Sequence, residues 1–566
     1  MVGDLEHAVK RLRPWIEPLV IGASASAIAM LLQSLLRSQW QIRGLPERVM
    51  EWLLLFVPLD LFERGLAQFG ADAKELALTA TVWAVAALLA ALGAFLMVRG
   101  WHGWRLLGVG VTLWLLTMLV LMPVTGAGLF ATALPLSPSL TDAGYLLVFL
   151  AYACVLQLAT LRPPAHEQVM QDRRALLAGL TGVVLSGGLA AFAGRDGGIA
   201  SSSLPLAAPA TAPARATTPL PAAAAQPTVQ PAPTPEPFPT PPPLRRLARN
   251  QDGALTAAGR PKGQLAPTIT TNDDFYVVTK NAVADPLLDA ATWRLVVDGE
   301  VNAPIQLDYR TLLALPSVEV TKTLECISNF TAACNLTSFG CDLLSTARFR
   351  GARLSDVVEL AGGLKSSAMG LAVLSTDEFS AGLPLEVVQD PETLVAYQMN
   401  GEPLPREHGF PARLIVPGRY GMKNPKWLAG IRAMDREYAG WYEQRNWDKD
   451  GIVKTMSRID SPVDGATLPS GAQRVAGIAY AGDRGISLVE VSADDGATWQ
   501  IARFLERSAG KDAMMRWETT FVMPAAGSLT LSVRATDGTG EAQSREFQLP
   551  QPDGAAGWAS ITVWSA

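Results

Sequence analysis

The chain has 566 residues, of which 49% are hydrophobic, and a formal net charge of -5 at pH 7. This length exceeds what one hydrophobic core supports, so several folding units are expected. The mildly acidic balance gives no basic surface and excludes nucleic acid as an expected partner. Four cysteines are too few for a disulfide scaffold.

The first third contains stretches long and apolar enough to cross a bilayer, which takes roughly 20 residues of helix. They are residues 16–36, 75–98, 105–125, 143–161 and 175–195. Another apolar piece, 49–62, is a candidate for a sixth, half-inserted segment. The pattern predicts an α-helical membrane bundle of about five transmembrane helices over residues 1–195.

Lysine and arginine residues set the expected orientation of these spans. They cluster before the first and the fifth span, at Lys10, Arg11, Arg13, Arg162, Arg173 and Arg174. Such clusters stay on the cytoplasmic side, so we expect a multi-pass protein of the cell membrane with everything after residue 195 extracytoplasmic, on the periplasmic side. Four arginines conflict with this orientation by falling in a loop assigned outside: Arg37, Arg43, Arg48 and Arg64. The pair Arg173 and Arg174 also matches part of a twin-arginine export signal, and both interpretations stay open.

The predicted spans carry no residues suited to a membrane cofactor. None contains a histidine, and their cores lack Asp, Glu, Lys and Arg. A membrane haem needs axial ligands such as paired histidines, so no haem is predicted. Charged residues inside spans mark ion and proton routes, and their absence favours an anchor, with a quinone-facing site as the alternative.

Residues 196–265 are predicted to be a linker rich in Pro and Ala. Between 196 and 248 the sequence has no apolar periodicity and cannot form a core. Proline-rich segments favour an extended conformation of about 3.1 Å per residue. The soluble part is therefore expected to be tethered near the membrane.

Residues 266–455 read as a domain of mixed α and β elements. Residues 293–301 are expected to be a strand that runs into a turn, and a short helix from 307 is expected to end before Pro316. Residues 318–329 are expected to be a strand that runs into a loop, with Cys326 at the strand end. Functional groups are often presented at such strand ends. Residues 348–363 are predicted to be a loop followed by an amphipathic helix, and 409–431 a buried strand followed by a loop with Gly and Lys.

Residues 456–566 have a different texture. Apolar and polar residues alternate along them, and Asp-Gly turns recur at close intervals. This pattern is typical of an all-β sandwich, and an immunoglobulin-like domain is expected.

Two motifs carry a family resemblance. TLECISN at 323–329 and NGEPLPREHGFPARLIVPGRYGMKNPKWL at 400–428, followed by the β-rich segment, resemble the sulfite oxidase family of molybdopterin enzymes. The resemblance implies a mixed α+β sulfite-oxidase-type molybdopterin domain between the membrane bundle and the sandwich. It also implies molybdopterin, the molybdenum cofactor, and a possible homodimer formed through the sandwich.

The resemblance assigns roles to individual residues. Cys326 would be the protein ligand to molybdenum and a catalytic residue; a soft thiolate suits this metal. Trp447 stands where the family has a catalytic tyrosine beside the metal. The expected cofactor-binding residues are Tyr276, Val277, Lys280, Asp377, His408, Arg413, Asn424 and Lys426.

Cys334 and Cys341 follow Cys326 in a long loop. Outside the cytoplasm they are a possible disulfide, with two free thiols or an extra metal ligand as the alternatives. No C-x-x-C-H haem motif occurs, so electrons are expected to pass to or from a separate electron carrier or a quinone.

The sequence departs from the family at its substrate pocket. Val278 and Thr331 occupy two positions where sulfite oxidases have arginines. A dianionic substrate without matching charges is costly to desolvate, so a neutral sulfoxide fits better than sulfite. We expect a membrane-anchored extracytoplasmic oxidoreductase that carries out two-electron oxygen-atom transfer on a small, sulfur-containing substrate. The alternatives are a catalytically inactive membrane-tethered binding or assembly protein and a transporter with a regulatory soluble part.

Overall fold

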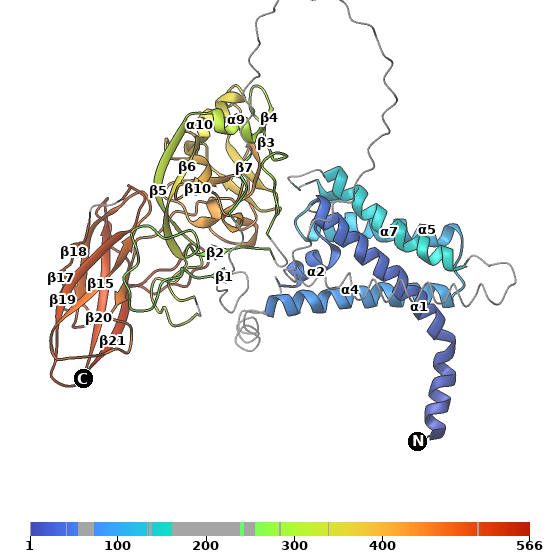
Figure 1. The fold of residues 1–566 in the computed structure, drawn as a ribbon, viewed down its shortest axis with the longest axis horizontal. Coiled ribbons are helices and arrows are strands. Elements are labelled where there is room, and N and C mark those ends of the chain that lie inside the picture. Colours follow the sequence, from blue (N-terminus) through green and yellow to red (C-terminus); the bar gives the residue numbers. More distant parts are fainter. Residues whose placement is uncertain are drawn as a thin grey trace, which may run out of the picture.

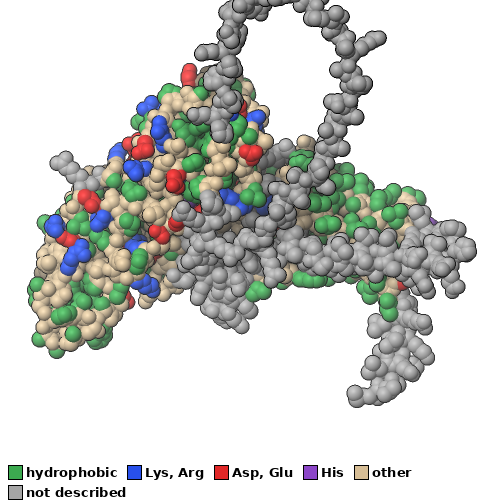
Figure 2. Space-filling model, in the orientation of Figure 1, with side chains coloured by type: hydrophobic (Ala, Val, Ile, Leu, Met, Phe, Trp, Pro, Cys, Tyr) green, Lys and Arg blue, Asp and Glu red, His purple; other side chains and the backbone are tan. Residues whose placement is uncertain are grey.

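The computed structural model of the chain consists of a helical N-terminal region, a central mixed domain and a β-rich C-terminal domain (Figure 1). The structure describes residues 2–40, 42–54, 73–132, 134, 138–160, 238–242, 255–281, 285–337, 339–506 and 509–566. In the space-filling view, hydrophobic side chains cover much of the visible helical region, and charged side chains are spread over the other two domains (Figure 2).

The helical region contains four described helices long and apolar enough to cross a membrane, at Trp15–Arg37, Leu76–Val98, Trp104–Val124 and Pro138–Thr160. These match the first four predicted spans, and the fifth, 175–195, lies outside the described residues. The elements are α1 (Val2–Trp40), α2 (Leu45–Leu54), α4 (Ala73–Val98), α5 (Trp104–Leu116), η2 (Thr117–Leu121), α6 (Met122–Val124), η3 (Leu129–Ala131) and α7 (Pro138–Thr160).

Of the candidate half-inserted segment 49–62, the structure describes residues 49–54, which form the end of α2. The third span has a π-helical turn, η2, which ends two residues before Pro123. Proline lacks the N–H that an α-helix requires and its ring crowds the preceding turn, which accounts for the local widening.

The central domain has two five-stranded sheets that enclose one core. In the first sheet the order is β4 (Ile305–Asp308), β3 (Arg294–Gly299), β12 (Leu428–Met434), β7 (Gly370–Ser375) and β8 (Ser380–Leu383). In the second it is β10 (Glu402–Pro403), β9 (Leu394–Met399), β6 (Leu344–Arg353) and β5 (Ser317–Glu325), with β11 (Arg413–Ile415) also on β9. The short pair β1 (Leu255–Thr256) and β2 (Val277–Val278) shows that folded structure already begins within the predicted linker.

Short helices connect these strands: α9 (Tyr309–Ala314), α10 (Leu354–Leu360), α11 (Glu386–Gln389), η4 (Arg406–His408), η5 (Gly421–Lys423) and η6 (Glu443–Arg445). Asp308 caps α9 by accepting from the backbone N of Thr311 at 2.9 Å, which fixes where β4 turns into helix. Gly362 and Gly363 end α10 in the left-handed conformation, as expected for a helix C-terminus.

One prediction for the central domain is wrong. Residues 348–353, expected to be a loop, form the end of β6, which pairs with β5 on one side and β9 on the other. The arginines in this stretch obscured a strand in which Arg348 and Arg350 are exposed and Phe349 between them is buried in the core.

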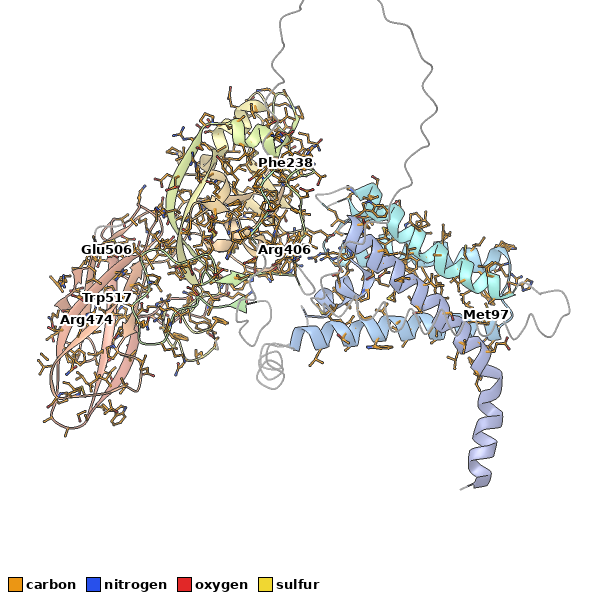
Figure 3. The ribbon with its side chains drawn as sticks, viewed as in Figure 1. Met97, Phe238, Arg406, Arg474, Glu506 and Trp517 are labelled. Carbon is orange, nitrogen blue, oxygen red and sulfur yellow. A yellow bond between two sulfur atoms is a disulfide. The ribbon has the colours of Figure 1, made fainter. Side chains whose placement is uncertain are left out.

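The C-terminal domain has a four-stranded and a five-stranded sheet that share a core around Trp517 (Figure 3). The first is β13 (Met456–Ser461), β15 (Gly471–Tyr480), β19 (Met515–Met523) and β18 (Arg503–Phe504). The second is β14 (Thr467–Leu468), β21 (Ala559–Ser565), β20 (Ser528–Asp537), β16 (Ile486–Ser492) and β17 (Gln500–Ile501). The predicted β-rich character is therefore confirmed.

A buried polar contact joins the central and C-terminal domains. Asp512 forms an ion pair with Lys322 on β5, and both side chains are 2% exposed. Asp512 also accepts from the hydroxyl of Tyr480 at 2.6 Å and from the backbone N of Gly418 at 3.0 Å. Because Gly418 precedes η5, this contact fixes the turn that forms part of the pocket described next.

Candidate functional site

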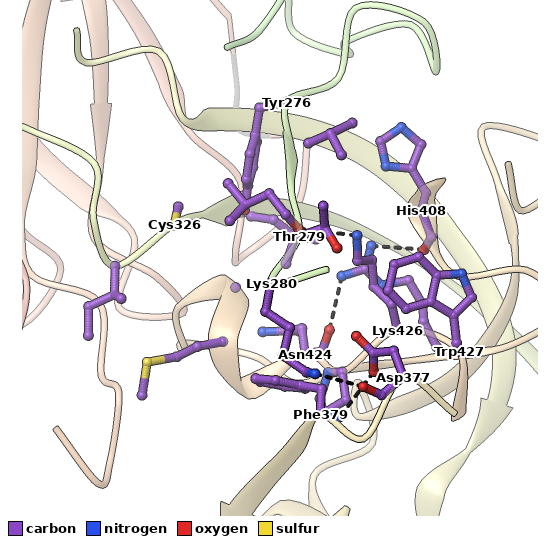
Figure 4. Close-up of a pocket in the computed structure, with 18 of the residues that line it drawn as sticks. Tyr276, Thr279, Lys280, Cys326, Asp377, Phe379, His408, Asn424, Lys426 and Trp427 are labelled. Atoms are coloured by element: carbon purple, nitrogen blue, oxygen red, sulfur yellow. Dashed lines mark hydrogen bonds between the residues drawn. The ribbon is translucent and has the colours of Figure 1, made fainter. Parts of the chain in front are cut away.

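A pocket in the central domain is lined by residues from β2, the end of β5, the turn between β7 and β8, β11 and the loop that leads from β11 to β12 (Figure 4). Its lining includes nine residues selected from the sequence: Cys326, Tyr276, Val277, Lys280, Asp377, His408, Arg413, Asn424 and Lys426. Figure 4 places Cys326 at one side of the pocket and His408, Lys426 and Trp427 at the other. The pocket thus has a thiol end and a cationic end.

Cys326 is the first residue after β5 and is 7% exposed. Its backbone N donates to the carbonyl of Leu343 at 3.0 Å, and its sulfur lies 2.9 Å from the hydroxyl of Ser328. Burial raises the pKa of the Cys326 thiol, and the Ser328 hydrogen bond partly offsets this. The thiol is therefore protonated at neutral pH unless a bound metal replaces the proton.

Arg413 lies on β11 with its guanidinium buried at the cationic end. It donates to the carbonyl of His408 at 3.2 Å and to that of Asn424 at 3.1 Å. Its Nε has no hydrogen-bond partner among the described residues. Burial lowers the pKa of Arg413 to about 10, so it stays charged at neutral pH. A buried cation with an unused donor suits an anionic ligand.

His408 lies at the end of η4 and is 2% exposed. Its Nε2 lies 3.1 Å from the carbonyl oxygen of Asn272. Burial, followed by the nearby Lys426 and Arg413 charges, lowers the pKa of His408 to about 3. The ring is neutral at pH 7, with Nε2 assigned as the donor and Nδ1 as an acceptor.

Lys426 and Asn424 come from the loop between β11 and β12. Lys426 donates to the carbonyls of Val278 at 3.2 Å and Glu407 at 2.8 Å, and burial lowers its pKa. The side chain of Asn424 is engaged within the loop: it accepts from the backbone N of Val416 at 2.7 Å and donates to Tyr420 at 2.9 Å. The Asn424 side chain therefore holds the loop in shape.

Lys280 and Asp377 meet in the wall of the pocket. Nζ of Lys280 donates to the backbone oxygen of Asp377 at 2.6 Å. The Asp377 carboxylate accepts from Asn281 at 3.2 Å and from the backbone N of Phe379 at 3.1 Å. These bonds hold the turn between β7 and β8 against the segment that follows β2.

Two tyrosines line the pocket, Tyr276 and Tyr442. Burial raises the pKa of both, and the next largest cause for each is the nearby Cys326. Both hydroxyls therefore keep their protons across the physiological range. A side chain on Gly421 would place its Cβ 2.8 Å from the Tyr276 hydroxyl, so glycine is needed at this close approach.

Trp447, selected from the sequence as the aromatic residue beside the metal, does not line the pocket. Its ring packs edge-on against Tyr442 at 5.9 Å. The chain makes a 3₁₀ turn at η6 and reaches a left-handed residue, Asn446, before Trp447. Tyr442 therefore lines the pocket, and Trp447 packs against the ring of Tyr442.

A buried ion pair fixes Tyr442 relative to the pocket floor. Lys423 in η5 pairs with Glu443 in η6, with side-chain exposures of 0% and 6%. Lys423 also donates to the carbonyl of Gly382 at 3.0 Å. Sequence reasoning did not select this pair, because charged residues are usually exposed.

Cys334 and Cys341 form a disulfide in the loop after Cys326. The remaining free cysteines are Cys154, which is exposed, and Cys326. Cys326 is thus the only pocket thiol among the described residues, and no described group of three His, Cys, Asp or Glu residues could hold a metal by itself. A metal at this site needs most of its ligands from an organic chelate.

These features fit a molybdenum-bearing pterin cofactor. A soft sulfur stands at one end of the pocket, and Arg413 and Lys426 supply positive charge at the other.

Comparisons with known proteins agree with the geometry. The family model for the oxidoreductase molybdopterin binding domain matches residues 282–442, and that for the Mo-co oxidoreductase dimerisation domain matches residues 451–549. Human mitochondrial sulfite oxidase is 33% identical over 313 residues, covering 48% of this chain and 56% of that protein. Sulfite oxidase of Arabidopsis thaliana is 30% identical over 280 residues, covering 42% of this chain and 71% of that protein.

Two further matches have lower coverage or structural similarity. Nitrate reductase [NADH] of Ulva prolifera is 30% identical over 266 residues, covering 39% of this chain and 31% of that protein. The crystal structure of the sulfane dehydrogenase SoxCD from Paracoccus pantotrophus has a TM-score of 0.45 and 25% identity, covering 49% of this chain and 75% of that chain.

The chain belongs to the sulfite oxidase family of molybdenum oxidoreductases. It spans about half the length of the curated mammalian relatives that it matches.

Proposed function

We propose that the chain is a membrane-anchored molybdopterin-dependent oxidoreductase that transfers an oxygen atom to or from a neutral sulfur compound such as a sulfoxide. The observation that carries this proposal is that one pocket has Cys326 at its thiol end and Arg413 and Lys426 at its cationic end. The proposed domains are the membrane bundle at 1–195, the linker at 196–265, the molybdopterin domain at 266–455 and an immunoglobulin-like domain at 456–566.

The proposed roles follow from the contacts. When bound, the cofactor would supply the two-electron chemistry, and Cys326 would hold its metal. Arg413, Lys426 and His408 would bind the cofactor's polar groups, the first two by charge and His408 through the free Nδ1. The hydroxyls of Tyr276 and Tyr442 stay protonated because burial raises their pKa, so each can donate a hydrogen bond to a substrate oxygen.

The residues at the two expected arginine positions support a neutral substrate. Val278, at one of them, lines the pocket with an aliphatic side chain. Thr331, at the other, is 3% exposed and its hydroxyl has no hydrogen-bond partner among the described residues. Neither side chain carries a charge, so an anionic substrate would lose its hydration without gaining a cation from these two positions.

The helical region supports a membrane location with the catalytic domains outside the cytoplasm. The hydroxyl of Tyr145, near the start of α7, donates to the carbonyl of Arg43 at 2.7 Å. Gln157, near the end of α7, accepts from the backbone N of Gly103 at 2.7 Å, in the loop after α4. The chain therefore leaves α7 at the face opposite to Arg43.

The central domain contacts the Arg43 face, since Arg43 donates to Asn281. The chain must return to that face after α7, and the predicted span at 175–195, outside the described residues, would supply the crossing. Three of the four arginines that conflicted with the charge rule are engaged here: Arg43 as just described, Arg37 with Glu47 at 3.4 Å and Arg48 with Glu378 at 2.8 Å. Arg64 lies outside the described residues. Electrons would pass to or from a separate carrier or a quinone, and the C-terminal domain would form a homodimer.

The test is to purify the chain from a host that makes molybdopterin, measure bound molybdenum, and assay dye-coupled turnover of methyl sulfoxides and of sulfite. We expect about one molybdenum per chain and faster turnover of the sulfoxides than of sulfite, with turnover abolished in Cys326→Ser. Protein that folds but binds no molybdenum would support the inactive binding protein instead. Preference for sulfite would contradict the charge argument alone.

A further inference from the structure

The connector between α1 and α2, with Arg43, and the first turns of α2, with Arg48, contact the central domain beside the pocket. Arg43 donates to Oδ1 of Asn281 at 2.7 Å, and Arg48 donates to Oε1 of Glu378 at 2.8 Å. The partners lie 238 and 330 positions further along the chain. Both arginines are 3% exposed. A cation buried to this degree is strongly unfavourable without its partner, whereas an exposed ion pair contributes little.

These contacts end on the turn that forms one pocket wall. Asn281 accepts from Arg43 and in turn donates to the carboxylate of Asp377 at 3.2 Å, and Asp377 lines the pocket. Glu378, the next residue, has a φ of +63°, a left-handed conformation that residues other than glycine rarely adopt. Such a conformation persists only where neighbouring contacts enforce it. The carboxylate of Glu378 lies 2.8 Å from Arg48 and 3.7 Å from Arg43.

The helical region also approaches the second wall of the pocket. A Cβ on Gly126, in the loop after α6, would lie 3.6 Å from Oε1 of Gln444. Gln444 is two residues after Tyr442, which lines the pocket. Tyr442 meets Phe379 edge-on at 5.8 Å, so the two walls that the helical region approaches also touch each other. Figure 1 shows the helical region beside the central domain, with α2 on the near side.

We propose that the helical region is part of the cofactor site, with Arg43 and Arg48 acting as positioning residues that hold the Asp377–Glu378 turn against the pocket. This inference rests on the proposed function, because it takes the pocket to be the cofactor site. It assigns the anchor a second task beyond attachment: the pocket wall reaches its working geometry only when the helical region is docked.

The docking is tested without any measurement of activity. A protease site is inserted between residues 196 and 237, membranes that contain the full chain are cleaved, and the soluble part that stays with the membranes is measured. The wild-type soluble part should stay bound. Arg43→Ala with Arg48→Ala should weaken retention by roughly 30-fold or more, the factor that corresponds to about 2 kcal/mol for a broken buried charge contact.

Three variants serve as controls for this experiment. Glu378→Gln removes the charge from the other side of the contact and should release the soluble part as well. Arg48→Lys keeps a cation at position 48 and should retain the soluble part as the wild type does. Arg436→Ala removes an exposed arginine whose partner is Asp435, and should change nothing. Formation of the Cys334–Cys341 disulfide in each variant checks that the central domain has folded.

The positioning role is tested on the uncut chain by the Mo(V) electron paramagnetic resonance spectrum and by kcat and KM measured separately. The double arginine variant should shift the spectrum and lower kcat. The Arg48→Lys variant, which keeps both cations, should show the spectrum and the kcat of the wild type. Release of the wild-type soluble part on cleavage, or equal retention of the variant, would overturn the docking. Lost retention with an unchanged spectrum would overturn the positioning role. Wild-type protein without molybdenum would overturn the proposed function and the positioning role together, while the retention result would still decide the docking.

Discussion

The buried pair between Lys423 and Glu443 gives a quantitative test of how the pocket is held together. Lys423→Met keeps the volume of the side chain but leaves the Glu443 carboxylate 6% exposed with no counter-ion in η5. Oε2 of Glu443 already has no hydrogen-bond partner among the described residues. Removing one member of such a pair costs about 3–5 kcal/mol.

Replacing both members should cost far less. Burial is the largest influence on Lys423 and lowers its pKa despite the neighbouring carboxylate. The desolvation penalty therefore exceeds the attraction within the pair. The double variant Lys423→Met with Glu443→Leu removes both buried charges, and we expect its stability to lie within about 1–2 kcal/mol of the wild type. A double-mutant cycle then gives a coupling energy of several kcal/mol.

The assay monitors thermal unfolding of the full chain in detergent by tryptophan fluorescence, because Trp441 and Trp447 lie on either side of Glu443 in the sequence. For a domain of this size 1 kcal/mol shifts Tm by roughly 2–4 °C, so each single variant should lose about 6–20 °C. The double variant should recover most of that loss. Single variants within 2 °C of the wild type, or a double variant that loses the sum of the single effects, would refute the reasoning.

Three further predictions concern the pocket and its neighbourhood. The pKa of His408 is about 3 in the folded chain and near 6.5 when unfolded, so the unfolded state takes up the proton first and the stability of cofactor-free protein falls as pH drops below about 6.5. His408→Gln should therefore flatten the fall of Tm between pH 6 and 4, and an equal slope in both proteins would contradict this. Tyr442→Phe should lower kcat by roughly 100-fold, whereas Trp447→Phe should leave most activity, and steady-state kinetics that reverse this order would exclude Tyr442 as the donor. Replacing Cys334 and Cys341 by Ser opens a short loop and should cost about 2–3 kcal/mol, measured as a Tm shift that reducing agent reproduces in the wild type; an unchanged Tm would show that the disulfide adds no stability.

The thiol end of the pocket was the part most accessible from the sequence. Alternation along 318–325 predicted β5 and therefore the position of Cys326 at a strand end. The residues of the cationic end could be selected because they fall within long motifs. Their convergence depends on pairings that no local pattern encodes, such as β11 and β6 both lying on β9.

Local patterns were less informative where tertiary contacts override them. The arginines along 348–353 made the end of β6 resemble a loop. Counting positions in a motif selected Trp447, because the residue types do not reveal the turn at η6 that follows Tyr442. The arginines at 43 and 48 read as an exception to the charge rule. Their partners lie hundreds of residues away, so only the folded chain explains their positions.

The bond between sulfur and molybdenum is the central claim, and X-ray absorption at the molybdenum edge measures it most directly. Wild-type protein and Cys326→Ser are loaded with cofactor in the same host, and the number of sulfur neighbours around molybdenum is compared. We predict one sulfur neighbour fewer in the variant. An unchanged sulfur count, in a variant that still binds molybdenum, would contradict the assignment of Cys326 as the ligand.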